Sequence, residues 1–364
     1  MICSLTLFAA LLPTLINGKS IPLHEATKII PTMSEEHWKE DAEELRVASG
    51  IDKAADSRKA TLSSVIKGYG VEDESLVSAI VALGEATANI AVLLTNYVEH
   101  TYAGSQNASG DDQLHLDIEC DEAVFRAVRE SKVYATVASE ETPEETHVGE
   151  GEFSLGCDPL DGSSIIDANF SVGSIYGIWP GKKLLGRTGR EQVASAIALY
   201  GPRTLLCIAI PSVKKVFEVT LVKNRTSWDI SRKDITIKPT GKVFAPGNLR
   251  ATNDHEKYDK LVKHWISDRY TLRYTGGMVP DVYHIFAKSK GVFSNVSSPS
   301  ARAKLRLLYE IAPIGLVVEC AGGCTTHEAA DKSVLDIEIE SLNLQLGVCF
   351  GSTEEVKKFK EFMF

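Results

Sequence analysis

The sequence predicts a layered α/β fold with two subdomains and a cleft between them. Helix-like patterns dominate residues 35–131, residues 152–237 are mostly strand-like, and beyond Pro239-Thr-Gly241 the two kinds of segment alternate. Helices and sheets in such an order bury their apolar faces best as stacked layers. We therefore divide the chain into a hydrophobic leader (residues 1–33), a first subdomain (residues 34–238) and a second subdomain (residues 239–364).

Most of the expected strands lie in the first subdomain. Apolar side chains recur at helical spacing between Leu76 and Leu94, and Gly68 and Gly70 separate two helices. The expected helices of this subdomain cover residues 35–66, 72–102 and 115–131, and its expected strands cover residues 133–139, 153–157, 171–179, 204–210, 216–222 and 227–237. In the second subdomain we expect helices over residues 254–268, 276–288 and 302–315, and strands over residues 269–274, 291–296 and 344–350.

The composition is that of a globular protein and disfavours nucleic acid as a partner. The chain has 364 residues, with 39 basic and 49 acidic side chains and a net charge of −10. Nucleic acids are bound by clustered Lys and Arg, and an acidic balance opposes this. Much of the charge is local, because residues 140–161 hold eight acids and no Lys or Arg. The seven cysteines include no Cys-x-x-Cys pair, which indicates reduced thiols rather than a disulfide framework.

The N-terminus leaves the location of the protein open. Residues 1–18 carry no charge and contain the apolar run Leu5–Leu12, which resembles the core of a signal peptide. No basic residue precedes this run, no typical cleavage site follows it, and Met33 could serve as a cytosolic start. We expect a cytoplasmic protein, with a plastid or another organelle as the alternative. We expect no segment beyond the leader to be long and apolar enough to span a membrane.

The most informative motif is Cys157-Asp-Pro-Leu-Asp-Gly-Ser-Ser164, which follows a strand-like run. We expect the proline to end that strand, because it cannot donate to the strand ladder. Asp158 and Asp161, with the carbonyl of Leu160 between them, offer the hard oxygen ligands that suit Mg²⁺. Gly162 lets the backbone approach closely, so that the amides of Ser163 and Ser164 can receive a phosphate. The simpler alternative is an Asp-Gly turn with a serine helix cap.

Further acidic residues could converge on the same place. Glu140 and Glu141 follow a strand-like run, and Asp111 and Asp117 bracket the start of the helix expected over residues 115–131. Each of these side chains taken alone fits a solvated surface carboxylate. A convergent set would be repulsive without a cation, so it would imply a divalent metal ion.

Two segments could supply the basic half of the site. In Lys304-Leu-Arg-Leu-Leu-Tyr-Glu310, the composition alone favours a surface ion pair between Arg306 and Glu310, one helical turn apart. The alternative is that Lys304 and Arg306 bind phosphate while Glu310 binds metal in the same cleft. Arg273-Tyr274-Thr-Gly-Gly-Met278 fits a strand end with a glycine turn, and it also offers a cation and a phenol.

Together these motifs resemble the fructose-1,6-bisphosphatase / sedoheptulose-1,7-bisphosphatase family, over about residues 40–350. The motifs at residues 157–164 and 304–310 carry the likeness to the family. Resemblance to the sedoheptulose branch comes from Gly177-Ile-Trp-Pro-Gly181, Tyr200-Gly-Pro-Arg-Thr204, Pro246-Gly-Asn-Leu-Arg-Ala-Thr252 and the segment 270–281. The resemblance implies a five-layer α-β-α-β-α sugar-phosphatase fold with the active site in the cleft between the subdomains.

The resemblance also implies a role for each candidate residue. Asp117 and Glu141 would orient and deprotonate the attacking water. The implied metal ligands are Asp111 in a supporting role, Glu140, Asp158, the Leu160 carbonyl, Asp161 and Glu310, around two or three Mg²⁺ ions, with Mn²⁺ as an alternative. The implied substrate-binding residues are Asp161, Gly162, Ser163, Ser164, Asn248, Arg273, Tyr274, Met278, Lys304 and Arg306.

The implied function is Mg²⁺-dependent hydrolysis of the C1 phosphate of sedoheptulose 1,7-bisphosphate. The first alternative is fructose 1,6-bisphosphate as the main or a joint substrate, and the second is a catalytically silent regulator that binds sugar phosphates. The resemblance further implies a homo-oligomer, a dimer or a tetramer, in which Arg273 reaches the site of a neighbouring subunit.

Overall fold

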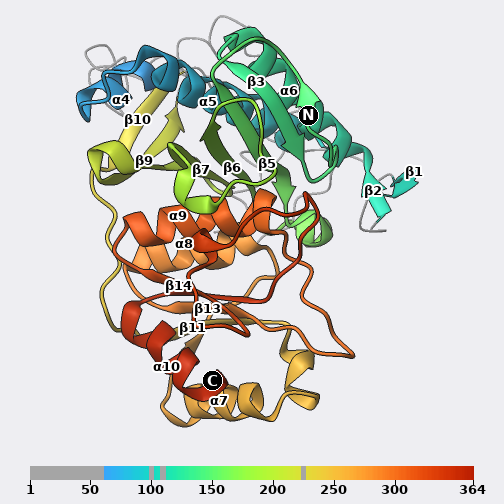
Figure 1. Cartoon of the computed structure of the whole chain (residues 1–364), viewed down its shortest axis with the longest axis vertical. Coiled ribbons are helices and arrows are strands. Elements are labelled where there is room, and N and C mark those ends of the chain that lie inside the picture. Colours follow the sequence, from blue (N-terminus) through green and yellow to red (C-terminus); the bar gives the residue numbers. More distant parts are fainter. Residues whose placement is uncertain (1–60, 98–101, 107–111, 223–226) are drawn as a thin grey trace, which may run out of the picture. The chain divides into compact units, whose positions relative to one another are not determined.

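The computed structural model of the chain divides into residues 1–59 and residues 60–364, and it describes residues 61–97, 102–106, 112–222 and 227–364. The leader, most of the first expected helix and Asp111 lie outside the described residues. The described part forms five layers, in the order helix, sheet, helix, sheet, helix (Figure 1). The layered α/β fold predicted from the sequence is therefore confirmed.

The first sheet has eight strands and carries two of the acidic motifs. Its strand order is β10-β9-β8-β7-β6-β5-β3-β4, and all neighbouring pairs are antiparallel except β3 and β5. All residues of β3 and β5 are buried, as expected of strands covered on both faces. The strands are β3 (Tyr134–Ser139), β4 (Thr146–His147), β5 (Phe153–Asp161), β6 (Val172–Pro180), β7 (Ala194–Tyr200), β8 (Thr204–Ile210), β9 (Lys215–Val222) and β10 (Ser227–Arg232).

Helices α4 (Leu62–Gly68), α5 (Glu74–Asn96) and α6 (His115–Ser131) cover the outer face of this sheet. The Asp73 side chain caps α5 by accepting hydrogen bonds from the amides of Ser75 and Leu76. By length and composition, α5 could cross a membrane, so the prediction that nothing beyond the leader could do so is wrong. However, 61% of its most apolar window is buried inside the structure, as in the core helix of a soluble protein.

The central layer consists of α8 (Met278–Lys288), α9 (Ala312–Cys320) and the π-helical turn Leu307–Ile311 that precedes α9. Their apolar side chains form one core cluster with the inner faces of both sheets. Because the start of α8 and the turn before α9 border the cleft described below, this layer connects the packing of the core to the site.

The second sheet has five strands in the order β12-β11-β13-β15-β14. It consists of β11 (Val243–Gly247), β12 (Thr271–Leu272), β13 (Val292–Asn295), β14 (Cys324–His327) and β15 (Val348–Gly351). Helices α7 (Glu256–Ser267) and α10 (Thr353–Met363) pack on its outer face around Trp265 and Phe359. The remaining short elements are β1 (Tyr102–Gln106), β2 (Asp112–Leu114) and 3₁₀ turns at Ser163–Ala168, Gly189–Glu191, Pro211–Val213, Leu249–Asn253 and Val334–Asp336.

Several predicted boundaries are wrong, since the strands expected over residues 227–237, 269–274 and 344–350 cover Ser227–Arg232, Thr271–Leu272 and Val348–Gly351, and two further errors lie at the site. Strand β5 does not end before Pro159 but continues to Asp161, and its pairing with β6 is irregular between Asp158 and Asp161. The missing N–H of Pro159 falls at this irregularity, where a proline is tolerated. The helix expected over residues 302–315 begins only at Leu307, because the backbone of Arg306 is extended (φ −96°, ψ 135°) and pairs with Gln345.

Candidate active site

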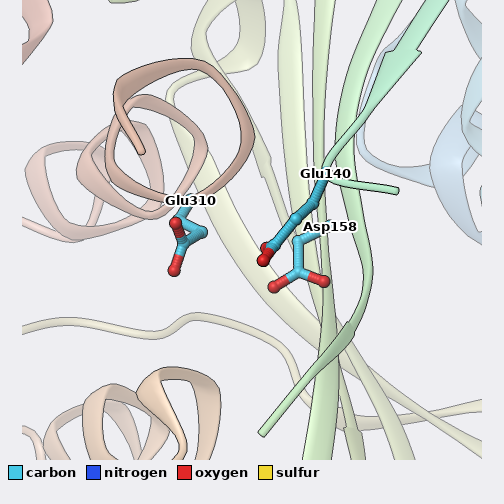
Figure 2. A group of neighbouring side chains, drawn as sticks. All are labelled: Glu140, Asp158 and Glu310. Carbon is cyan, nitrogen blue, oxygen red and sulfur yellow. The ribbon is translucent and has the colours of Figure 1, made fainter. Parts of the chain in front are cut away.

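Three carboxylates from distant parts of the sequence meet in the cleft (Figure 2). Glu140 follows β3, Asp158 lies in β5, and Glu310 lies in the turn before α9. One carboxylate oxygen of each lies within 4.8 Å of one oxygen of the other two. Asp158 and Glu310 are buried, and Glu140 is partly buried. Oxygen ligands at this spacing fit a divalent cation, which would neutralise their mutual repulsion.

The electrostatics of the three carboxylates favour the same conclusion. Burial, followed by the charge of Glu140, raises the pKa of Asp158 and that of Glu310 well above the usual range of a carboxyl group. The carboxylates therefore resist ionisation unless a positive charge is placed among them. A divalent cation supplies that charge, so the donor set fits the metal ion that the sequence motifs imply.

Arg306 supplies one positive charge to this cluster. Its guanidinium lies against the carboxylate of Glu140 and 3.9 Å from that of Glu310, and its side chain is only 5% exposed. Burial alone would lower the pKa of Arg306, but Glu140 and then Glu310 raise it above its ordinary value. The interpretation of Arg306 and Glu310 as a surface ion pair is therefore wrong, because both side chains are buried at the cleft.

Asp161 holds the start of α8 against the end of β5. Its two carboxylate oxygens accept hydrogen bonds from the amides of Met278 (3.1 Å) and Val279 (2.6 Å). Burial raises its pKa to about 7, although the two amides act in the opposite direction. Asp161 borders the cleft but does not belong to the cluster of three carboxylates, so its role as a metal ligand stays a prediction.

The turn after Asp161 depends on a glycine. Gly162 has φ +89°, in the left-handed region, and a Cβ atom at this position would lie 3.3 Å from the Cα of Gly277. This close approach brings two turns together, and Ser163 and Ser164 follow at the cleft surface. The turn after the acidic pair therefore requires a glycine, and its role in binding phosphate stays a prediction.

The cleft has a volume of about 580 Å³ and brings most of the predicted residues together. Asp117 is buried there, and its carboxylate accepts a hydrogen bond from the amide of Leu114 (2.9 Å). Tyr274 is 47% exposed and stands at the cleft surface. The predicted residues that line the cleft are Asp117, Glu140, Glu141, Asp158, Leu160, Asp161, Gly162, Ser163, Ser164, Tyr274, Met278, Lys304, Arg306 and Glu310.

Two of the predicted substrate-binding residues do not line this cleft. The side-chain amide of Asn248 donates hydrogen bonds to the carbonyls of Val296 and Ala301 (2.7 Å each) and so fixes a loop near the site. The exposed side chain of Arg273 donates to the neighbouring carbonyl of Leu272. Their roles stay predictions, and Asp111 lies outside the described residues.

Some residues that line the cleft were not found by the sequence reasoning, and three of them are polar. Asp281 is 2% exposed and accepts hydrogen bonds from the turn that carries Tyr274. Asn295 ends β13, and its side-chain oxygen is buried without a hydrogen-bond partner in the described part of the chain. Asp167 also lines the cleft. Of the three, only Asp281 could have been found from the sequence, since it is an acid in the first turn of an expected helix that follows two glycines.

Carboxylates that can hold a metal ion, set beside a backbone turn and basic side chains, are what a metal-dependent phosphatase requires. Comparison with known proteins agrees with this class. The model of the fructose-1-6-bisphosphatase N-terminal domain matches residues 77–230, and that of the C-terminal domain matches residues 237–364. The chain belongs to the fructose-1,6-bisphosphatase family, as its motifs indicated, and is a sugar bisphosphatase of that family.

Individual relatives are named after two different substrates. The chain is 44% identical to the chloroplastic sedoheptulose-1,7-bisphosphatase of Spinacia oleracea, over 80% of this chain and 75% of the relative. It is 37% identical to the class 1 fructose-1,6-bisphosphatase of Geobacter sulfurreducens, over 72% of this chain and 82% of the relative.

Solved structures show the same fold. A crystal structure from Toxoplasma gondii, provisionally assigned as a sedoheptulose-1,7 bisphosphatase, has a TM-score of 0.77 at 39% identity and covers 84% of this chain and 99% of that one. The holo form of the Leishmania major fructose-1,6-bisphosphatase has a TM-score of 0.78 at 26% identity, with the same coverage.

Proposed function

We propose that this protein catalyses the Mg²⁺-dependent hydrolysis of the C1 phosphate of sedoheptulose 1,7-bisphosphate, giving sedoheptulose 7-phosphate and phosphate. The observation that carries the proposal is the meeting of Glu140, Asp158 and Glu310 in one cleft beside Lys304 and Arg306. The choice of sugar is supported by the relatives with 42–45% identity, which are named sedoheptulose-1,7-bisphosphatases.

Glu140, Asp158, Glu310 and the carbonyl of Leu160 would hold the metal ions, with Asp161 beside them. Mg²⁺ prefers such oxygen ligands and commonly shares them with substrate phosphates, and Mn²⁺ is the alternative ion. Two or three bound ions would supply Lewis-acid stabilisation of the charge that develops on the phosphoryl oxygens and on the leaving alkoxide.

The side chains around this centre would orient the reacting groups. The carboxylates of Asp117 and Glu141 would hold the attacking water and accept its proton as its oxygen bonds to phosphorus. The bond between phosphorus and the C1 oxygen would break in the same in-line displacement, and the leaving C1 oxygen would take a proton from solvent water to end as a hydroxyl. The amides of Ser163 and Ser164 would hold the reacting phosphate, because backbone N–H groups and a glycine turn favour an anion.

The rest of the substrate would be held from the second half of the chain. Lys304 and Arg306 offer cations at the cleft, and Tyr274 offers a phenol. Because a bisphosphate carries a phosphate at each end, a site of this kind needs donors for the second phosphate at a distance from the metal centre that binds the first. Arg273 would add a cation across a subunit boundary if the protein forms the homodimer or homotetramer that we propose.

Phosphate release from both bisphosphates tests the proposal directly. We expect the purified protein to hydrolyse sedoheptulose 1,7-bisphosphate with the higher kcat/KM, and only when Mg²⁺ or Mn²⁺ is present. Equal or faster turnover of fructose 1,6-bisphosphate would refute the assignment of the sugar. Full activity of Asp161→Ala would contradict the metal site as proposed.

Fructose 1,6-bisphosphate is the second candidate substrate, because relatives with 35–37% identity are named fructose-1,6-bisphosphatases. A catalytically silent regulator is disfavoured, because the described part of the chain keeps the carboxylate cluster together with the basic residues of the cleft.

The location and the assembly are also open to experiment. The cytoplasmic location expected from the sequence has no support, whereas plant and algal relatives named chloroplastic favour a plastid. A fluorescent fusion of the full chain tests the location. Light scattering during size-exclusion chromatography tests the proposed oligomer, and a monomeric mass would contradict it.

A further inference from the structure

The side chain of Asp281 binds the turn that precedes its own helix. One of its oxygens accepts hydrogen bonds from the amide of Thr275 (2.6 Å) and from the hydroxyl of the same residue (2.9 Å). The other oxygen accepts from the amide of Gly276 (3.1 Å). Asp281 is only 2% exposed, so these bonds are protected from competing water.

The same turn meets a second carboxylate immediately afterwards. Asp161 accepts from the amides of Met278 and Val279, so four of five consecutive amides between Thr275 and Val279 donate to one carboxylate or the other. Carboxylates that accept several backbone bonds hold a segment firmly, because bonds to a charged acceptor are the stronger kind. The turn thus has its conformation set by two acidic side chains rather than by a regular strand or helix.

The outer side of this turn faces the cleft. Tyr274, Gly276 and Met278 all line it, and Tyr274 directly precedes the first amide that Asp281 holds. The Tyr274 ring is not buried in a core, since it is 47% exposed. Its direction therefore depends on the backbone of the turn, and the backbone of the turn depends on Asp281.

We propose that Asp281 is a positioning residue for the substrate: it fixes the turn at residues 275–277 so that Tyr274 projects into the cleft and binds the non-reacting end of the sugar bisphosphate. This inference rests on the proposed function, because it assumes a sugar bisphosphate in the cleft. Asp281 itself does not take part in the chemistry and acts only through Tyr274.

A purely structural role would have a different signature, and α8 offers a matched control. Tyr283 lies on the same helix and donates a hydrogen bond to the buried carboxylate of Glu218 in β9 (2.6 Å). Tyr283→Phe removes one buried hydrogen bond from the helix without touching the turn. It should lower the unfolding temperature and leave KM unchanged.

The test variant is Asp281→Asn, which keeps the size of the side chain but replaces one acceptor oxygen by an NH₂ group. One backbone amide of the turn then faces a donor instead of an acceptor. We expect KM to rise about tenfold while kcat stays within about threefold, because the metal centre is untouched. Calorimetry with the product sedoheptulose 7-phosphate should show about the same tenfold loss of affinity. An unchanged KM, or a loss of kcat without a rise in KM, would overturn the proposal.

A double-mutant cycle with Tyr274→Phe shows whether the effect passes through Tyr274. If it does, the double variant has nearly the same KM as Asp281→Asn alone, because the phenol is already misplaced. If the two substitutions instead multiply their separate effects on KM, the proposal is overturned. The assays use whichever bisphosphate the wild type hydrolyses, with its monophosphate product, so a wrong choice of sugar does not affect this test. If the wild type hydrolyses neither bisphosphate, the proposed function is refuted, and the positioning role that rests on it is refuted with it.

Discussion

Compared with the wild type, the Asp158→Asn variant should be more stable against unfolding without metal and less stable with metal. One oxygen from each of the three clustered carboxylates lies within 4.8 Å of the others, and at that upper limit, with an effective dielectric constant of about 20, two carboxylates repel each other by about 3.5 kcal/mol. Asp158 faces two such neighbours, Glu140 and Glu310, and the positive charge of Arg306 offsets part of the repulsion. Asn can keep the hydrogen bond that Asp158 accepts from the amide of Leu160 (3.0 Å). We therefore expect a net gain of about 1–3 kcal/mol in the free energy of unfolding in EDTA at pH 8.

Excess Mg²⁺ should reverse the order of the two proteins. A ligand at 1,000 times its Kd stabilises the state that binds it by about 4.1 kcal/mol, which exceeds the variant's gain in EDTA, and the variant loses most of this stabilisation with one of its ligands. Urea unfolding followed by tryptophan fluorescence measures both conditions. Glu152→Gln removes an exposed acid of the same acidic segment and should change neither value by more than about 0.5 kcal/mol. If Asp158→Asn is less stable than the wild type in EDTA, the reasoning from repulsion is refuted.

The pH dependence of the metal-free wild type should have the same origin. The folded-state pKa of Asp158 and Glu310 is raised above the unfolded value, mainly by burial and then by Glu140, and that of Asp161 is raised to about 7. An acid whose pKa is raised on folding binds its proton more tightly in the folded state than in the unfolded state. Stability from these groups is therefore greatest below about pH 4 and is lost as the pH rises through 7. Saturating Mg²⁺ should flatten this dependence, and a profile unaffected by Mg²⁺ would contradict the assignment.

Three shorter predictions concern individual positions. Glu310→Gln should lower kcat by about 10²–10³-fold in a phosphate-release assay, because charge stabilisation at the reacting group is lost; a change under threefold would argue against its role. Gly162→Ala should cost about 1–2 kcal/mol of stability and also lower kcat/KM. Its control is Gly186→Ala, at φ +77° with its nearest neighbour 4.0 Å away, which should cost similar stability and leave kcat/KM unchanged. Lys304→Met should raise KM at least tenfold at constant ionic strength, and an unchanged KM would contradict phosphate binding.

The parts of the fold set by local pattern could be predicted from the sequence. The helix expected over residues 115–131 has those bounds in the structure, because its apolar face and its ends are encoded within one continuous segment. The metal-binding potential of Asp158 was also visible, since the spacing Asp-x-x-Asp-Gly is itself local. For the helix, neighbouring residues alone decide the backbone conformation, whereas at the Asp158 motif they indicated the ligands but not the course of β5.

Features set by long-range pairing could not be predicted in this way. Residues 305–307 have a helix-like pattern, but their backbone bonds to residues 344–346, so the helix begins two residues after Leu305. Strand β7 (Ala194–Tyr200) was missed because its alanines have no strand preference and are ordered by β6 and β8 on either side. The burial of Arg306 depends on Glu140, which lies 166 positions earlier in the chain. No local window contains both partners.

The carboxylate cluster takes Glu140 and Asp158 from the first sheet, whereas Glu310 lies in the helical layer between the two sheets. An ion held by all three therefore links the first sheet to the helices that the second sheet packs against. Any shift of that helical layer against the first sheet changes the distances between the ligand oxygens and so changes the affinity for the ion. Because coupling free energies are reciprocal, the ion must in turn restrain that shift by the same amount. The affinity of the proposed metal centre for its ion would therefore report how the helical layer is aligned with the first sheet, in addition to the role of the centre in the proposed chemistry.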